Sequence, residues 1–136
     1  MSEAANKQIA IAFQNGSGVS LGVTSAMLVS GIWGPGTGEQ PQIGGTILAG
    51  GTRRYVNLAT SPFTALGGNI SMTPATGGAI VISWSWLDGE EPSKFAYAQG
   101  TTSLTVNSAW TGLGSLSPTV QVWLASQNLR AAGAVR

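Results

Sequence analysis

The stretch that most constrains the fold is residues 76–87, Thr-Gly-Gly-Ala-Ile-Val-Ile-Ser-Trp-Ser-Trp-Leu. Successive side chains of a β-strand point to opposite faces, so alternate residues share a face. One face holds only large apolar side chains, namely Ile80, Ile82, Trp84 and Trp86. The other face is small and mixed, which predicts a central strand in a sheet packed against a second sheet. We expect both tryptophans to lie in the core; aromatic contact with a ligand or lipid is the alternative.

A period of two recurs along the chain between glycine-, proline- and asparagine-rich turns. No long amphipathic helix is visible. Besides 76–87, strands are predicted at 8–14, 19–23, 24–33, 42–49, 52–58, 69–73, 93–98, 101–106 and 119–125, with a hairpin turn at Asn15-Gly16. This pattern predicts an all-β protein, an antiparallel β-sandwich of about ten short strands. We expect one domain over residues 1–136, with loose tails at 1–7 and 126–136.

The side-chain inventory excludes most catalytic chemistry. The chain has no cysteine and no histidine, so disulfides, thiolate nucleophiles, Cys/His zinc sites and histidine acid–base catalysis are ruled out. No phosphate-binding loop or dinucleotide fingerprint occurs between a strand and a helix. We therefore expect a protein that is not an enzyme and uses no cofactor. The acidic residues at 88–91 could offer carboxylates to calcium, but a solubilising loop tip is the simpler interpretation, and we expect no metal site.

Charge is unusually scarce. Only 8% of the residues are charged, with a net charge of +1, against about 25% in an average soluble protein. Such a surface has little long-range field, which argues against nucleic-acid binding and favours self-association. The sequence shows neither a signal peptide nor a membrane-spanning stretch. We expect synthesis in the cytoplasm, followed by release or storage as inclusions, with action at target membranes.

A few residues stand out as candidate contact sites. Arg53 and Arg54 adjoin each other next to Tyr55. They could be the charges that protect an edge strand, or they could bind an anion or a phosphate headgroup. Three tryptophans lie near loops, namely Trp33, Trp110 and Trp123. Trp123 falls on the polar face of its strand, where it could meet a ligand or a membrane interface, or be buried under a loop.

Several segments taken together resemble the aegerolysin family, in particular its bacterial insecticidal members of low molecular mass. The resemblance spans residues 8–87. It rests on the strand Ile9–Asn15 followed by Ser17-Gly18 and Leu21, on Leu28 with Gly31-Ile32-Trp33, on Ile43 with Gly50-Gly51, and on Thr76–Ile80. Trp33 corresponds to the family's tryptophan after the glycine. The chain carries fewer charges than the family usually does.

The resemblance implies a β-sandwich that binds a membrane lipid or receptor and recruits a second toxin protein to form a pore. Two other hypotheses remain open. The first is a carbohydrate-binding lectin, in which tryptophans and amide side chains hold a sugar. The second is a self-assembling structural subunit, favoured by low charge and by exposed strand edges.

Overall fold

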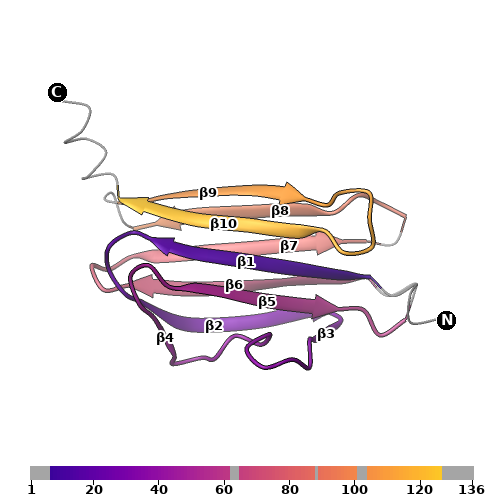
Figure 1. Ribbon diagram of the computed structural model, residues 1–136, viewed down its shortest axis with the longest axis horizontal. Helices are drawn as coiled ribbons and strands as arrows, with labels where there is room; N and C mark the ends of the chain where they lie inside the picture. Colours follow the sequence, from indigo (N-terminus) through magenta and orange to yellow (C-terminus); the bar gives the residue numbers. More distant parts are fainter. Residues whose placement is uncertain (1–6, 62–64, 88, 101–103, 127–136) are drawn as a thin grey trace.

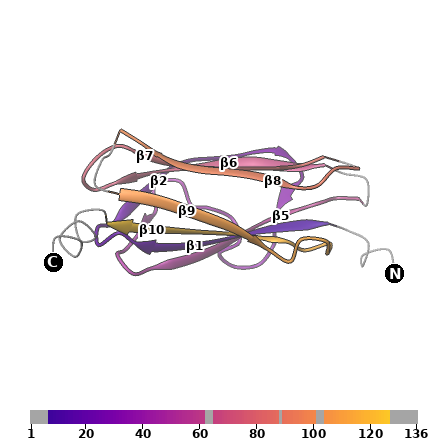
Figure 2. The same cartoon turned by 90° about the horizontal axis from the view of Figure 1, so that it is seen from above.

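The computed structural model describes residues 7–61, 65–87, 89–100 and 104–126. Within them the chain forms ten strands in two stacked five-stranded sheets (Figures 1 and 2). Sheet A has the order β3 (Ile32–Trp33), β5 (Thr52–Leu58), β1 (Gln8–Gly16), β10 (Thr119–Ser126), β9 (Leu104–Thr111). Sheet B has the order β4 (Thr46–Ile47), β2 (Leu21–Ser30), β6 (Leu66–Pro74), β7 (Ala79–Trp86), β8 (Ser93–Gln99).

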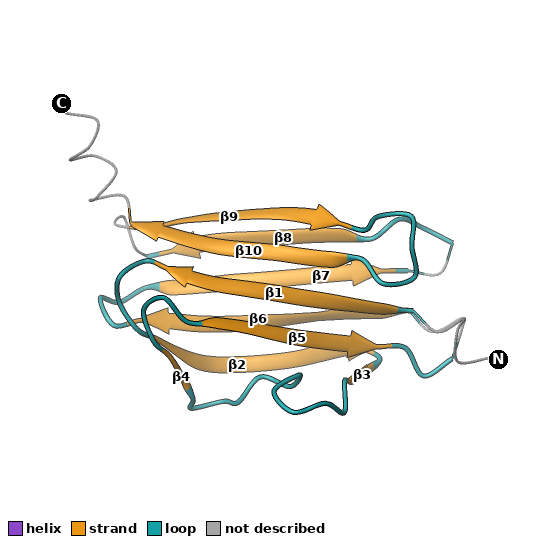
Figure 3. Ribbon diagram, in the orientation of Figure 1, coloured by secondary structure: helices purple, strands orange, loops and turns teal. Residues whose placement is uncertain are grey.

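These elements confirm the predicted all-β sandwich. All the regular structure of the described residues is strand, joined by loops (Figure 3). That part of the chain accordingly contains no helix with the length and hydrophobicity to cross a bilayer. The predicted tails fall mainly on residues 1–6 and 127–136, which lie outside the described residues, as do Asp88 and the start of the strand predicted at 101–106.

The core lies between the sheets, and strand alternation builds it. On β7 the predicted inward residues Ile80, Ile82, Trp84 and Trp86 are all buried. On β10 the inward residues Val120, Val122 and Leu124 are buried as well, on the face opposite to Trp123. Ile9, Ile11 and Phe13 of β1, the strand beside β10, are buried on the same inner face of sheet A and belong to the same core cluster as the β7 residues. Because every second residue of these strands is apolar, each sheet has one face that must be covered.

One strand pairing departs from the antiparallel prediction. β1 pairs with β5 in antiparallel fashion but with β10 in parallel, in the register Ala12 with Gln121 and Gln14 with Trp123. The first and last strands of the chain thus lie side by side at the centre of sheet A (Figure 1). This arrangement places side chains from both ends of the sequence on one surface.

The predicted hairpin at Asn15-Gly16 is wrong. Both residues end β1, and the next strand, β2, belongs to the other sheet. The buried side chain of Asn15 shapes this crossing: its Oδ1 accepts from the Ser17 hydroxyl at 2.6 Å and its Nδ2 donates to the Val19 carbonyl at 2.8 Å. An asparagine side chain that bonds the following backbone replaces the hairpin ladder here.

Other strand boundaries also differ. The strand predicted at 42–49 reduces to Thr46–Ile47, because the chain turns where the Gly45 amide donates to the Gln42 carbonyl at 2.9 Å. The two strands predicted between 19 and 33 are largely one strand, β2, with a register shift between Val23 and Ser25. β6 begins at Leu66, inside the predicted loop, and β9 extends to Thr111, which makes Trp110 a strand residue.

Candidate functional site

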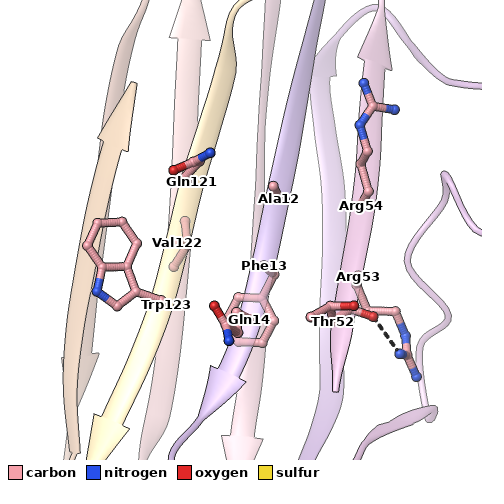
Figure 4. A pocket seen from close by; sticks show the side chains of 9 residues that line it. All are labelled: Ala12, Phe13, Gln14, Thr52, Arg53, Arg54, Gln121, Val122 and Trp123. Atoms are coloured by element: carbon pink, nitrogen blue, oxygen red, sulfur yellow. Dashed lines mark hydrogen bonds between the residues drawn. The ribbon is translucent and has the colours of Figure 1, made fainter. Parts of the chain in front are cut away.

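A hollow of about 420 Å³ lies on the outer face of sheet A, over the middle of β1 (Figure 4). Its floor is Ala12, which pairs with Arg54 of β5 on one side and with Gln121 of β10 on the other. The next outward residue, Gln14, lies between Thr52 and Trp123. The hollow therefore has a basic wall on β5 and an aromatic and amide wall on β10.

Side-chain length explains why a hollow forms there. In β1 the large inward residues Ile11 and Phe13 flank the small outward residue Ala12, which lies beneath the hollow. Neighbouring strands are only about 4.8 Å apart. Arg54 and Gln121 thus rise on either side of a methyl group and leave a trough between them. Its volume falls in the range of small-molecule sites, roughly 300–1,000 Å³.

The chemistry of this hollow suits an anionic or polar group held beside an aromatic ring. Arg54 is permanently charged and presents a planar fork of donors that fits phosphate or carboxylate. Gln14 and Gln121 can donate and accept. Trp123 is 38% exposed, which confirms its outward position and rules out burial under a loop. No carboxylate is among the described residues that line the hollow, so bound anions meet no repulsion there.

The two adjacent arginines point to different places. Strand alternation puts Arg54 on the outer face, whereas Arg53 turns to the sheet edge (Figure 4). There the Arg53 Nη1 donates to the Thr52 carbonyl at 2.8 Å and Nη2 donates to the Thr46 carbonyl at 3.2 Å. Both side chains are exposed, and β3 pairs with β5 only at Asn57 and Leu58. The stretch is therefore both an open edge and a cationic surface.

Tyr55 lies inside the sandwich, with only 3% of its surface exposed. Burial raises the pKa of its hydroxyl above 10.0, and the nearby Arg53 lowers it in part. The phenol is therefore protonated at neutral pH and can donate a hydrogen bond. It borders a second, smaller hollow at the edge of the sandwich, lined also by Arg53, Gln40 and Gln42.

The three loop-proximal tryptophans do not gather at one end. Trp33 lies in β3 and Trp110 in β9, at opposite edges of sheet A. Both are partly buried against the core, and Trp33 meets the ring of Trp84 edge-on at 6.2 Å. Of these three tryptophans, only Trp123 faces outward, so it alone is placed for contact with a large ligand or surface.

Six residues of the main hollow were not among the sequence candidates, namely Ala12, Phe13, Gln14, Thr52, Gln121 and Val122. The alternation of β1 could have indicated a small-residue face. The strands on either side of that face are determined by the parallel pairing of β1 with β10, and no local sequence pattern predicts this pairing. The hollow was therefore only partly visible from the sequence.

A further hollow of about 450 Å³ lies between the β7–β8 and β9–β10 loops. Trp86, Leu113 and Leu116 give it an apolar wall, and Glu90 and Glu91 add carboxylates. Trp86 is fixed by its Nε1, which donates to the Glu90 carbonyl at 2.9 Å, and by Lys7, whose Nζ lies 4.8 Å from the ring centroid. Within the described part of the chain, no three acidic side chains come close enough to hold a metal ion.

The outer face of sheet B differs from that of sheet A in having no charged side chain among the described residues. Its exposed apolar residues are Met27, Val29 and Phe95, of which Phe95 is 63% exposed and stacks obliquely on Tyr97 at 4.9 Å. The charged residue of these strands, Lys94, instead bonds the Ser108 hydroxyl of β9 at 2.9 Å. The two sheets thus present a basic hollow and a neutral face.

Comparison with known proteins gives a structural answer only. No protein-family model and no curated protein sequence matches the chain. The structure of IP-1A from Alcaligenes faecalis is similar with a TM-score of 0.68 at 14% identity, over 89% of this chain and 91% of that one. The lipid binding protein Nakanori is similar with a TM-score of 0.66 at 10% identity, over 87% and 70%.

The fold is shared with both proteins. At 14% and 10% identity the likeness concerns the fold alone, so the roles of individual residues must come from this chain's own geometry.

Proposed function

We propose that this protein binds lipid at a membrane surface, through the hollow on the outer face of sheet A. The observation that carries the proposal is the placement of Arg54 and the exposed Trp123 on opposite walls of one trough floored by Ala12. The planar guanidinium of arginine can form two parallel hydrogen bonds with a phosphate headgroup. Tryptophan side chains are enriched at the depth of the lipid headgroups in membrane proteins. The structural similarity to a lipid binding protein supports the same function.

The proposed function needs no chemical step. No histidine or cysteine exists to activate a nucleophile, and the lining of the hollow contains no carboxylate to act as a base. We propose that the protein is a binding component and not an enzyme. Its low charge favours this, since few charged groups would lose water when a face lies on a bilayer.

The aegerolysin resemblance extends the proposal beyond lipid binding. The protein would then be one component of a pore-forming, insecticidal toxin that recruits a second protein at the target membrane. The neutral outer face of sheet B is available for contact with another protein or with a second copy of the chain. Cytoplasmic synthesis with later release belongs to the same proposal.

Co-sedimentation with vesicles tests the function. Phosphatidylcholine vesicles, with and without phosphatidylserine, should carry the protein down, and Trp123→Ala and Arg54→Gln should each weaken binding about tenfold. Phe95→Ala is the matched control, because it removes an aromatic from the opposite face that is more exposed than Trp123. If vesicles of both compositions leave the wild-type protein in solution, the proposal fails.

A lectin is the second candidate, favoured by one feature of the same hollow. Gln14 and Gln121 place two amide groups beside the exposed indole of Trp123, and an aromatic face with amide donors can also hold a sugar ring. A glycan array distinguishes the two functions. Sugar binding that Trp123→Ala abolishes, without any vesicle binding, would favour the lectin.

A further inference from the structure

The smaller hollow at the edge of the sandwich has a volume of about 230 Å³. It opens where β5 of sheet A passes β4 of sheet B, and the chain between β3 and β4 closes one side with Gln40 and Gln42. Arg53 and Tyr55 line it from β5. Its volume is below the roughly 300 Å³ at which sites for drug-sized molecules begin, so it fits one small group.

Tyr55 is the residue that marks this hollow as a site. Only 3% of the residue's surface is exposed. Within the described residues its hydroxyl has no hydrogen-bond partner, although every fully enclosed side-chain polar atom there has one. The hydroxyl therefore still touches the hollow. A hydroxyl that is open to the hollow and bonds no described protein group can donate a hydrogen bond to a ligand bound there.

Arg53 supplies the positive charge. Its two hydrogen bonds to the Thr46 and Thr52 carbonyls hold the guanidinium across the edge between the sheets and leave further N–H donors free. The nearest acidic residue in sequence, Glu39, is not part of the lining: its Oε1 accepts from the Gly36 amide at 3.2 Å. The described lining therefore offers donors and a cation without a carboxylate.

We infer that this edge hollow binds a single phosphate group, with the Tyr55 hydroxyl and the Arg53 guanidinium as its donors. The side-chain amides of Gln40 and Gln42 also line the hollow and can donate further hydrogen bonds to the phosphate. The raised pKa of Tyr55 keeps the phenol protonated and able to donate. Arg53 also lines the trough on sheet A, but Tyr55, Gln40 and Gln42 line only the edge hollow, so the two sites have different sets of donors. It does not depend on the proposed function; the phosphate could be free or part of a lipid headgroup.

Titration of the ¹⁵N-labelled protein with inorganic phosphate tests the inference, with chloride at equal ionic strength as reference. We expect saturable shifts of the Gly38, Gln40 and Gln42 amides with a Kd of about 1 mM. Tyr55→Phe should weaken binding about tenfold, since it removes one charge-assisted hydrogen bond. This variant leaves no partner unpaired, so its amide spectrum should otherwise be unchanged. Arg54→Gln removes the same charge outside this hollow and is the matched control: the phosphate-induced shifts of the Gly38, Gln40 and Gln42 amides should remain as in the wild type.

A second arm uses phosphatidylcholine vesicles and identifies the source of the phosphate. Vesicle binding that weakens in Tyr55→Phe, without binding of inorganic phosphate, would assign the site to a lipid headgroup. If phosphate shifts the spectrum no more than chloride does, and vesicle binding is the same in Tyr55→Phe, the inference is overturned. Vesicle binding that is lost only in Arg54→Gln, together with no phosphate shift beyond that of chloride, would overturn it while leaving the proposed function intact.

Discussion

Replacing Asn57 by alanine should strongly destabilise the protein. Asn57 is completely buried on β5, and its side chain joins the two sheets. Its Oδ1 accepts from the Gly67 amide and from the Trp84 Nε1, both at 2.9 Å. Its Nδ2 donates to the Ser30 carbonyl at 3.1 Å and to the Ile32 carbonyl at 3.3 Å. The side-chain amide of Asn57 thus forms hydrogen bonds with four residues, three of them in sheet B.

The magnitude follows from the groups left without partners. In Asn57→Ala the buried Gly67 N–H and Trp84 Nε1–H both lose their acceptor. An unsatisfied buried donor costs about 1–3 kcal/mol, so the two together cost about 4 kcal/mol. The stability of a whole domain is only about 5–15 kcal/mol, so this loss is a large fraction of it. For a domain of this size it should lower Tm by about 12 °C.

Urea denaturation, followed by tryptophan fluorescence, measures the effect, with Asn107→Ala as the control. Asn107 is exposed on β9, so its replacement should change the free energy of unfolding by less than about 0.5 kcal/mol. A loss of under about 1 kcal/mol in Asn57→Ala would refute the reasoning. It would mean that the four hydrogen bonds do not stabilise the packing of the sheets.

Three further predictions concern Tyr55, two glycines and Arg54. The pKa of Tyr55 is raised in the folded state, so its contribution to stability is complete below pH 10.0 and is lost as pH rises through the folded-state pKa; urea midpoints on both sides of this pH should show the loss in wild type and not in Tyr55→Phe. Gly18 and Gly31 both have a φ of 86°, but an added Cβ meets nothing at Gly18 and lies 2.9 Å from the Leu58 carbonyl at Gly31. Thermal unfolding should therefore show a loss of about 1 kcal/mol for Gly18→Ala and about 3 kcal/mol for Gly31→Ala, and equal losses would contradict the close approach. Vesicle binding should weaken with added salt in the wild type and depend less on salt in Arg54→Gln, as co-sedimentation at graded ionic strength can check.

The sequence predicted the two layers of the fold because a strand with one buried face has an apolar residue at every second position. The apolar faces of β7 and β10 followed directly from that pattern, and their inward residues are buried as expected. The partners of each strand were not predictable in the same way. The local preference of Asn15-Gly16 for a hairpin says nothing about which sheet the next strand joins, and the parallel pairing of β1 with β10 joins opposite ends of the chain.

The candidate site was predictable to a similar extent. Alternation alone placed Trp123 on the polar side of its strand, and it separates Arg54 from Arg53. It could not show that these side chains flank a small-residue floor, because that requires the order of three strands. Nor does a local pattern show that the Tyr55 ring lies buried beside a hollow, since burial at a sandwich edge depends on distant segments.

The most direct test of the central claim asks which face of the protein meets the bilayer. The chain contains no cysteine, so a single introduced thiol can carry an environment-sensitive fluorophore at one known position. Gln121→Cys reports from the hollow on sheet A, and Ser83→Cys reports from the outer face of sheet B. With phosphatidylcholine and phosphatidylserine vesicles, we predict a blue shift for the label at position 121 and none at position 83. A shift only at position 83, or at neither, would contradict lipid binding through sheet A.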